Sequence, residues 1–254
     1  MQPSDVTPPT PARQCVVLSG GLGTRLGELG RSRPKHLVEV LGRPFAHRQL
    51  EWLATQGVTE VVECIGHLGD AIRAELGDGS PFGLSITYSD DGDATSRPGT
   101  GGALLLAHRR GLLHERFCVL YGDSWLRLDL RALWEAADGS GAPATMAVID
   151  NRDGREPSNV TLSDDRLRYS KAPIVAGAGT DMTHIDYGIS VLNRKLIAGL
   201  DDGTEAPRLD LADAMAAWST RDLVAPFEAH LPYDEVGTPE GVARLEAALL
   251  AGGR

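Results

Sequence analysis

Short apolar runs alternate with longer amphipathic segments through the first half of the chain. The runs have the length of buried strands, which predicts strands at residues 14–18, 58–65, 84–88, 117–121 and 144–149. The segments between them repeat apolar residues at helical spacing, which predicts helices at residues 44–56, 70–76, 103–110 and 129–137. Strands that alternate with helices in this way form a mainly parallel sheet with helices on both faces.

From Asp150 onward the pattern changes to short strands and turns. We expect strands at residues 159–162, 167–169, 187–192 and 227–233, and helices at residues 194–200, 209–218 and 239–250. No linker separates the two halves, so we predict a single α/β domain over residues 13–254. Residues 1–12 contain four prolines among small polar residues and lack the pattern of a signal peptide, which predicts a disordered tail.

Composition and charge argue against several classes of protein. The chain has 254 residues, with 25 Lys and Arg against 35 Asp and Glu, and a net charge of −10. This balance argues against a nucleic-acid partner, and the chain lacks the roughly 18 consecutive apolar residues that a membrane span needs. Each of the three cysteines lies in a separate apolar strand, which favours buried, reduced thiols in a cytoplasmic protein. A homo-oligomer is compatible with the sequence, but no feature specifies one.

A glycine-rich loop follows the first predicted strand, with the sequence Gly20-Gly21-Leu22-Gly23-Thr24-Arg25-Leu26. Glycines leave backbone N–H groups free to point at an anion and let a phosphate approach closely. Arg25 adds a planar fork for phosphate oxygens, and Lys35 adds a point charge. The loop is neither a P-loop, since no Gly-Lys-Ser/Thr closes it, nor a dinucleotide fingerprint, since Leu26 replaces the third glycine. We therefore assign nucleotide binding to Ser19, Gly20, Gly21, Gly23 and Thr24.

Asp123 follows the strand predicted at residues 117–121, with one glycine between them. A carboxylate at the carboxyl end of a strand can hold Mg²⁺ together with phosphate oxygens, or it can cap a turn. The glycine loop favours the metal role, because transfer at a phosphate builds negative charge that a cation must neutralise.

The glycine loop and the following Pro34-Lys35 resemble the signature of the sugar-1-phosphate nucleotidyltransferases, also called nucleotide-sugar pyrophosphorylases. The likeness continues along nearly the whole chain, through residues 57–61, 98–103, 121–123 and 235–238. It implies a Rossmann-like, mixed and mostly parallel sheet of the glycosyltransferase-A type, with the active site at the carboxyl ends of the strands. It also implies a nucleotide-binding half over about residues 13–150 and an acceptor-binding half over residues 151–254.

The resemblance assigns roles to further residues. Gly99, Thr100 and Gly101 correspond to the loop that reads the base, where glycines can place N–H groups near the ligand or pack against the base. Asp123 and Glu235 correspond to the ligands of Mg²⁺. Asp234 is the alternative to Glu235, because both carboxylates suit this ion.

The acceptor site is implied in the same way. Lys171 resembles the lysine that holds the phosphate of the acceptor, and Tyr187 and Gly188 lie in a strand that would line the acceptor pocket. Ser170 stands where many relatives carry the Glu that grips the sugar, and Ala172 interrupts the Lys-Pro pair. The sequence therefore does not specify the sugar.

We expect an Mg²⁺-dependent enzyme that transfers a nucleotidyl group from a nucleoside triphosphate to a sugar 1-phosphate and releases pyrophosphate. Arg25, Lys35 and Asp123 are its expected catalytic residues, and the phosphate of the acceptor would attack the α-phosphorus directly. Three alternatives stay open: a cytidylyltransferase acting on a non-sugar phosphate or phosphonate, a non-catalytic nucleotide-binding regulatory subunit, and a metal-dependent glycosyltransferase. The base of the triphosphate is not specified.

Overall fold

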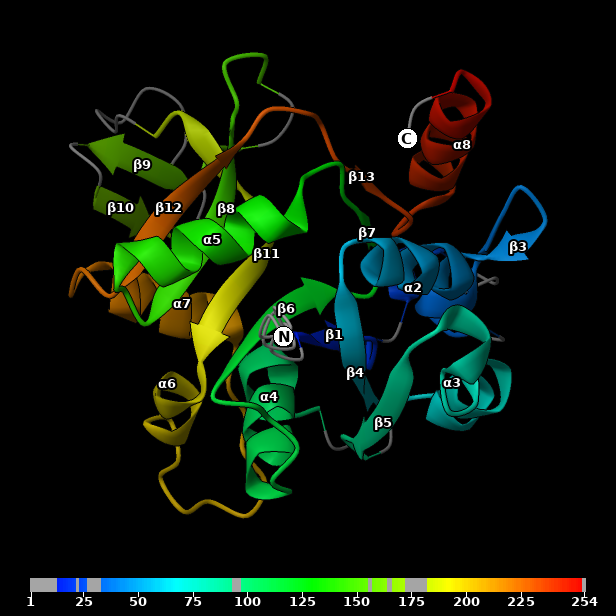
Figure 1. The fold of residues 1–254 in the computed structure, drawn as a ribbon, viewed down its shortest axis with the longest axis horizontal. Coiled ribbons are helices and arrows are strands. Elements are labelled where there is room, and N and C mark those ends of the chain that lie inside the picture. The colour runs from blue at the N-terminus through cyan, green and yellow to red at the C-terminus, as the bar shows by residue number, and fades with distance from the viewer. Residues whose placement is uncertain are drawn as a thin grey trace, which may run out of the picture.

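A nine-stranded sheet runs through the middle of the molecule (Figure 1). The computed structural model describes residues 13–21, 23–26, 33–92, 97–154, 157–163, 166–171 and 182–252, so the tail predicted at residues 1–12 lies outside it. The main path of the sheet follows the order β10 (Arg166–Tyr169), β9 (Val160–Ser163), β11 (His184–Asn193), β6 (Arg116–Tyr121), β1 (Arg13–Leu18), β4 (Val58–Ile65) and β5 (Ser85–Asp90). Beside this path, β8 (Ala144–Asp150) pairs with β11 and with β12 (Val224–Ala229).

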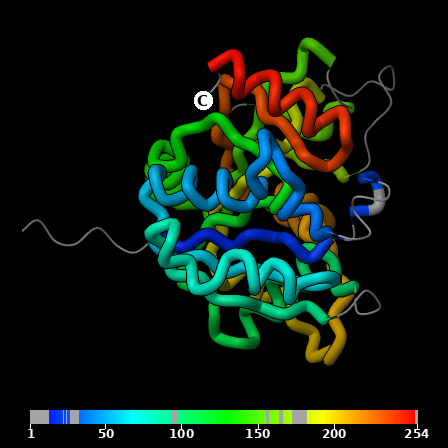
Figure 2. The backbone as a smooth tube through the Cα atoms, turned by 90° about the vertical axis from the view of Figure 1, so that its right-hand side faces the viewer, coloured from blue at the N-terminus to red at the C-terminus, as the bar shows by residue number. Residues whose placement is uncertain are grey.

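The pairing confirms the predicted mixed sheet. β6, β1, β4 and β5 are parallel neighbours, so their carboxyl ends lie at one edge of the sheet. β11 runs antiparallel to both β6 and β8 and thereby joins the second half of the chain to the first. Figure 2 shows β1, in dark blue, running through the centre of the molecule.

Helices cover both faces of the sheet, as predicted. On one face, α2 (Phe45–Thr55), α3 (Gly69–Leu76) and α5 (Leu130–Ser140) bury their apolar side chains in a shared core. On the other face the cover is α4 (Gly99–Arg109), α6 (Arg194–Ala198) and α7 (Leu211–Ser219). The last helix, α8 (Pro239–Leu250), packs Leu245 into a smaller cluster with Phe45 and Trp125 and lies above α2 in Figure 1.

Short polar side chains define where several helices begin. Asp129, Asn193, Asp210 and Thr238 each accept a hydrogen bond from a backbone N–H in the first turn of α5, α6, α7 and α8. Such caps satisfy donors that have no partner within the helix. Because Asp129 and Asp210 act as caps, α5 and α7 begin one and two residues later than predicted.

Four elements differ by three residues or more from the sequence expectation. β11 begins at His184, where residue 187 was expected, and α5 ends at Ser140, where residue 137 was expected. α4 begins at Gly99, so the predicted glycine loop forms its first turn. β12 covers Val224–Ala229, where residues 227–233 were expected, and it includes Pro226. Proline lacks a backbone N–H, but among the strands that the structure describes β12 pairs with β8 alone and is therefore an edge strand, where proline is tolerated.

Two short pairs of strands lie outside the main sheet. β2 (Glu39–Val40) pairs with β3 (Arg43–Pro44), and β7 (Ser124–Trp125) pairs with β13 (Asp234–Glu235). Three short 3-10 helices complete the described elements: η1 (Thr24–Leu26), η2 (Lys35–Leu37) and η3 (Ser80–Phe82). The β7–β13 pair is important for the site, because it connects the segment that follows β6 to the segment that leads into α8.

The cysteine prediction is confirmed. Cys15, Cys64 and Cys118 are buried in β1, β4 and β6, and all three are free thiols. Within the described residues, every helix is too short or too polar to cross a membrane.

Candidate active site

A cavity of about 520 Å³ opens at the carboxyl ends of β1, β4, β5 and β6. The general rule for open α/β sheets places ligands at this edge. Glycines follow three of these strands: Gly20 follows β1, Gly66 follows β4 and Gly122 follows β6. A Cβ atom on Gly20 would lie 3.4 Å from the N of Gly66, and one on Gly122 would lie 3.0 Å from the O of Leu18. The absence of side chains therefore lets the strand ends pack closely around the cavity.

The glycine-rich loop forms one wall of the cavity. Gly20, Gly21 and Arg25 line it, together with Ser19 at the end of β1. Gly23 has a φ of +62°, in the left-handed region that favours glycine, and its O accepts a hydrogen bond of 2.9 Å that closes the following turn. Gly21 is different, because a Cβ atom there would meet nothing within 4 Å and its φ is not in that region. The described backbone thus has no need of glycine at position 21.

Thr24, the remaining residue assigned to nucleotide binding in this loop, begins η1. Its side chain lies outside the described part of the structure.

Lys35 and Asp123 meet at the wall of the same cavity. Lys35 Nζ forms an ion pair with Asp123 Oδ2, and both side chains are 16% exposed. The N of Val236 donates a hydrogen bond of 2.9 Å to the O of Asp123. A Cβ atom on Gly237 would lie only 2.9 Å from Lys35 Nζ and 3.4 Å from Asp123 Oδ2. Glycine at position 237 therefore leaves the space that this ion pair occupies.

The structure separates the roles of Asp234 and Glu235. Asp234 is buried, and its carboxylate lies 2.7 Å from Arg127 Nη2 and 3.3 Å from Arg244 Nε. Glu235 lines the same cavity as Asp123. Asp234 is therefore engaged by two arginines, and Glu235 is the carboxylate that β13 contributes to the cavity wall.

These carboxylates suit a hard cation. Asp123 and Glu235 offer oxygen donors on one cavity, and oxygen is the ligand that Mg²⁺ prefers. Among the residues that the structure describes, no three His, Cys, Asp or Glu side chains gather into a complete metal cage. Mg²⁺ commonly binds through one or two carboxylates together with substrate phosphates, so an incomplete protein set fits this ion.

The start of α4 is packed against the segment that leads into α7. A Cβ atom on Gly99 would lie 2.3 Å from the O of Leu209, and one on Gly101 would lie 3.1 Å from the N of Leu211. Thr100 Oγ1 accepts from the N of Leu211 at 2.9 Å. Gly99 and Thr100 also line the cavity, whereas Gly101 is buried against this segment. Close backbone packing is thus a sufficient reason for glycine at positions 99 and 101.

Lys171 is connected to the cavity through two other side chains. Its Nζ lies 2.8 Å from Asp210 and 3.1 Å from Asp213. Asp210 in turn accepts a hydrogen bond of 3.1 Å from Thr100 Oγ1, which belongs to the cavity wall. Lys171 is 49% exposed, so these ion pairs restrain it only weakly.

Tyr187 has a different environment from the one that the sequence led us to expect. Its side chain is fully buried, and its hydroxyl accepts from the N of Arg127 at 3.0 Å and donates to the O of Leu231 at 2.8 Å. These contacts occupy the hydroxyl, and we do not retain Tyr187 as a side-chain contact to an acceptor. Gly188 has a φ of +91°, and a Cβ atom there would lie 3.3 Å from Ser124 Oγ, beside Asp123.

Asp91 is a cavity residue without a clear sequence signal. It is 8% exposed, and its Oδ1 has no hydrogen-bond partner among the described residues. Burial raises the pKa of Asp91 to about 7, and the nearby Arg110 guanidinium opposes this shift. A Cβ atom on Gly20 would lie 3.2 Å from its Oδ2, so Asp91 sits beside the glycine-rich loop.

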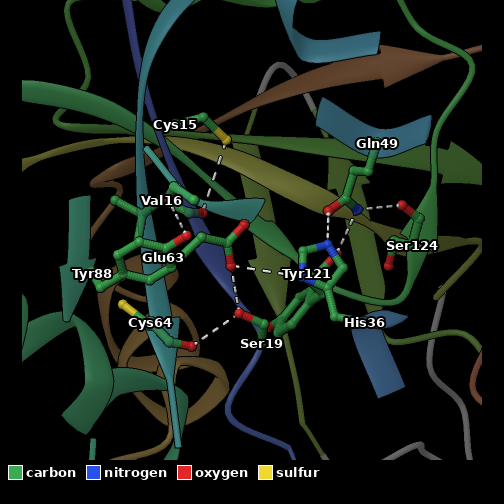
Figure 3. Close-up of polar contacts among 11 residues, drawn as sticks. Cys15, Val16, Ser19, His36, Gln49, Glu63, Cys64, Tyr88, Tyr121 and Ser124 are labelled. Carbon is green, nitrogen blue, oxygen red and sulfur yellow. Dashed lines mark hydrogen bonds and ion pairs between the residues drawn. The ribbon is translucent and has the colours of Figure 1, made fainter. Parts of the chain in front are cut away.

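Three more polar residues lie at or next to the cavity, of which His36 lines it, and sequence analysis assigned none of them to the site. His36, Gln49 and Glu63 are buried and linked to Ser19 (Figure 3). The one available signal was Glu63, a charged residue between the apolar pairs Val61-Val62 and Cys64-Ile65 of a predicted strand. His36 and Gln49 lie in amphipathic or loop-like sequence, where a buried polar residue cannot be distinguished from a surface one.

Comparison with known proteins identifies a family and several similar proteins. The sequence model of the family described as nucleotidyl transferase matches residues 14–159, more than half of the chain. A glucose-1-phosphate thymidylyltransferase of Streptomyces antibioticus is 36% identical over 205 residues, which cover 78% of this chain and 47% of that protein. A CMP-5'-(3-aminopropyl)phosphonate synthase of Streptomyces rubellomurinus is 44% identical over 117 residues, which cover 46% of this chain and 18% of that protein.

The solved structures agree in fold. The UDP-glucose pyrophosphorylase of Acinetobacter baumannii superposes with a TM-score of 0.74 at 19% identity, over 92% of both chains. The chain spans about half the length of several curated relatives that it matches, including 52% of a UTP–glucose-1-phosphate uridylyltransferase of Synechocystis. The fold and the family match agree with the resemblance read from the sequence motifs. The chain therefore belongs to the nucleotidyl transferase family.

Proposed function

We propose that this protein transfers a nucleotidyl group from a nucleoside triphosphate to a phosphorylated small molecule, with Mg²⁺ as its cofactor. One observation carries the proposal: the glycine-rich loop with Arg25, the Lys35–Asp123 pair and Glu235 all line one cavity at the carboxyl ends of parallel strands. A triphosphate needs backbone N–H groups and cations around its phosphates, and this cavity offers both. The three buried reduced thiols support a cytoplasmic location.

The chemistry is a direct displacement. An oxygen of the acceptor phosphate forms a bond to the α-phosphorus, and the bond from that phosphorus to the bridging oxygen of pyrophosphate breaks, with the electron pair leaving on pyrophosphate. Mg²⁺ bound by Asp123 and Glu235 would neutralise charge on the phosphate oxygens. Arg25 and the N–H groups of the glycine-rich loop bind the triphosphate, and Lys35 supplies a positive charge next to Asp123. The incoming oxygen is already anionic, so the reaction needs no general base.

The names of several relatives support a sugar 1-phosphate as the acceptor. Several relatives are named for transfer to glucose 1-phosphate, mannose 1-phosphate or a heptose 1-phosphate. We assign Lys171 to the phosphate of the acceptor. When the acceptor binds, Lys171 would leave its ion pairs with Asp210 and Asp213 and pair with that phosphate instead.

A cytidylyltransferase for an aminoalkyl phosphonate is the second candidate. It is favoured by the 44% identity over 117 residues to a relative named as such a synthase. A phosphonate presents the same oxygens to the α-phosphorus as a phosphate monoester, so the same cavity serves both acceptors.

A substrate panel tests the proposal and separates the candidates. Each of the five common nucleoside triphosphates is combined with sugar 1-phosphates and with 3-aminopropylphosphonate, and pyrophosphate release is followed with and without Mg²⁺. We expect one triphosphate and one acceptor class to exceed all others by about 100-fold, since a site built to hydrogen-bond its substrate discriminates at this level or better. Nucleotide binding that needs no Mg²⁺ and leads to no turnover with any acceptor would instead indicate a regulatory subunit.

Replacement of Gly21 by Ala tests whether the glycine-rich loop contacts phosphate. The added methyl group meets nothing within 4 Å in the protein, so we expect folding to be unaffected. It would project where a phosphate approaches the backbone, and the KM for the triphosphate should rise about 10-fold or more, which corresponds to ~1.4 kcal/mol.

Gly139→Ala is the matched control for this substitution. Gly139 is an exposed helical glycine that also has open space around it, and Ala there should stabilise α5 by up to ~1 kcal/mol. Its kinetic constants should equal those of the wild type. Equal KM values for the two variants would show that no phosphate approaches position 21.

A further inference from the structure

Four buried polar side chains form a continuous set of contacts at the cavity, which two of them, Ser19 and His36, line (Figure 3). Ser19 Oγ lies 2.5 Å from Glu63 Oε2, Glu63 Oε2 lies 3.6 Å from His36 Nδ1, and His36 Nε2 lies 3.0 Å from Gln49 Oε1. Each of these residues is at most 5% exposed. We call Ser19, His36, Gln49 and Glu63 the buried polar network.

Glu63 lies on the face of β4 whose other side chains are apolar. Its neighbours on the same face of β4, Val61 and Ile65, both belong to the apolar core beneath α2 and α3. Glu63 itself is fully buried. A carboxyl group in such a place is costly unless it is neutral or paired, so its presence calls for a physical reason.

The buried polar network touches three segments of the candidate active site. Ser19 opens the glycine-rich loop, and His36 follows Lys35 in η2. At the other end, Gln49 Nε2 donates to the O of Tyr121 at 3.1 Å and to the O of Ser124 at 2.8 Å. These two carbonyl groups flank the turn that contains Asp123. One set of contacts therefore reaches the loop, the lysine and the aspartate.

The hydrogen-bond pattern determines where the protons lie. Both donations to carbonyl groups come from the amide nitrogen of Gln49, so its Oε1 must accept, and His36 must donate from Nε2. A neutral imidazole then presents the lone pair of Nδ1 to Glu63 Oε2 at 3.6 Å. At 3.6 Å this contact is not a hydrogen bond, and an ionised Glu63 would place a negative charge beside that lone pair in an apolar core, which disfavours the ionised form.

The contacts of Ser19 accommodate a proton on Glu63. The Ser19 hydroxyl has one hydrogen but lies close to two oxygens, at 2.5 Å from Glu63 Oε2 and at 3.1 Å from the O of Cys64. A protonated Glu63 donates to Ser19 Oγ, and Ser19 then donates to Cys64. The O of Cys64 also accepts from the N of Ser19 at 3.0 Å, so it has a donor in either protonation state of Glu63.

Burial acts in the same direction. It raises the pKa of Glu63 to about 8, against a smaller opposing effect of Ser19, and it lowers the pKa of His36 to about 4. Both groups are then neutral near pH 7, and no buried charge needs a counter-ion.

The other titratable groups around the pair do not supply a charge to Glu63. Cys15 from β1 and Tyr88 from β5 lie near Glu63, Cys64 follows it in β4 with its side chain on the opposite face, and burial raises the pKa of all three. They stay neutral near pH 7. Asp123 and His47 are the further titratable groups near His36, with opposite effects on its pKa.

We propose that protonated Glu63 is a positioning residue, which holds Ser19 and His36 in place and thereby aligns the glycine-rich loop, Lys35 and the Asp123 turn for nucleotidyl transfer. This inference rests on the proposed function. Glu63 touches no substrate, and its effect passes through its neighbours. A displacement of about 1 Å in a reacting geometry can cost 100-fold in rate, so a network that fixes three segments has a measurable role.

Two substitutions at Glu63 separate positioning from packing. Glu63→Leu fills a similar volume without hydrogen bonds, and we expect a folded protein whose kcat falls at least 30-fold while the KM for the triphosphate changes less than 3-fold. Glu63→Gln keeps a donor for Ser19 and His36, and should retain kcat within about 5-fold of the wild type. A Glu63→Leu variant that retains kcat within 3-fold would overturn the proposal.

Val61→Ala is the matched control. Val61 lies on the same strand and face but contacts no member of the buried polar network through a polar atom. Its cavity should lower stability while kcat stays within 2-fold. An equal loss of kcat in Val61→Ala and Glu63→Leu would attribute the effect to a general loosening of β4 and contradict the positioning role.

Imidazole ¹⁵N spectra of the wild type test the network without any turnover. We expect His36 to be the neutral Nε2–H tautomer from pH 5 to pH 8, with its Nδ1 signal moving in Glu63→Leu. An imidazolium at pH 7, or an Nδ1–H tautomer, would overturn the assignment of the proton to Glu63. Because this readout needs no substrate, it also decides the case if Glu63→Leu does not fold, and it stays valid if no triphosphate–acceptor pair supports transfer.

The pH dependence of stability gives an independent check. Between about pH 5 and pH 8 the unfolded chain has ionised Glu63, whereas the folded protein keeps the proton, so the folded state binds more protons and stability falls as the pH rises. Relative to Glu63→Gln, the unfolding equilibrium constant of the wild type should grow by up to about tenfold per pH unit in this window. His36 titrates in both proteins, so its opposite contribution cancels in the comparison. A difference between the two proteins that does not vary with pH would contradict a protonated Glu63.

Discussion

Asp123→Asn lowers nucleotidyl transfer by about 1,000-fold or more and leaves the protein folded; this is the largest effect that we expect from a single substitution at the site. A loss of this size corresponds to ~4 kcal/mol of transition-state stabilisation, which is within the range of one metal or electrostatic contact in a shielded site. Asn keeps the shape of the side chain but loses the charge that would bind Mg²⁺ and that pairs with Lys35. The expected measurement is pyrophosphate release over a range of Mg²⁺ concentrations, beside thermal unfolding.

Stability should change little in this variant. The Lys35–Asp123 pair is partly exposed, and pairs of this kind contribute on the order of 1 kcal/mol or less. Asp129→Asn is the matched control, because Asn caps a helix about as well as Asp and Asp129 is not among the residues that line the cavity. Removal of divalent metal with a chelator should abolish wild-type activity, and added Mg²⁺ should restore it. Near-normal turnover of Asp123→Asn would remove Asp123 from the proposed metal site.

Asp234→Ala should destabilise the protein by about 3–5 kcal/mol, the range expected when one partner of a buried ion pair is removed. Asp234 and Arg127 are only 9% and 10% exposed, so the substitution leaves the charge of Arg127 without its carboxylate in the protein interior. The second partner, Arg244, is 66% exposed and contributes little. For a chain of this size, each kcal/mol lowers the Tm by roughly 2–4 °C, so a decrease of about 10 °C is expected.

Whereas Asp234→Ala should mainly lower stability, Glu235→Gln should affect activity more than stability. It removes a carboxylate from the cavity wall, so the Mg²⁺ concentration for half-maximal activity should rise at least 10-fold, with a stability loss smaller than that of Asp234→Ala. The two variants together identify the carboxylate that serves the metal. An unchanged Mg²⁺ requirement in Glu235→Gln, combined with a raised one in a well-folded Asp234 variant, would assign the metal to Asp234.

Local pattern was enough to predict most elements. The strand at residues 58–65 matches β4 at both ends, and the helix predicted at residues 239–250 matches α8 at both ends. Both are bounded by residues with local reasons to start or stop an element, such as the Thr238 cap before α8. At Gly99 and Val224 the observed element begins a few residues before the predicted one. In both cases the segment packs against or pairs with residues elsewhere in the chain.

The candidate site was predictable where chemistry is encoded in neighbouring residues. The spacing of Gly20, Gly21 and Arg25 indicated a phosphate-binding loop, and all three line the cavity. Lys35 and Asp123 were assigned separately, and the fold brings them into contact. The acceptor side was less predictable: the hydroxyl of Tyr187 is used inside the core, and no local pattern distinguishes such a tyrosine from one that faces a pocket.

The sequence by itself determined the class of fold, the order of its elements and the phosphate-binding loop, because each depends on residues that are close together in the chain. Only the tertiary structure decided that two arginines engage Asp234, that Glu235 shares a cavity with Asp123, and that Glu63 lies within reach of Ser19 and His36. These relations depend on strand order and register, which bring together side chains that are far apart in the sequence. A buried carboxyl group acquires its charge state and its role from those neighbours, and they exist only in the folded protein.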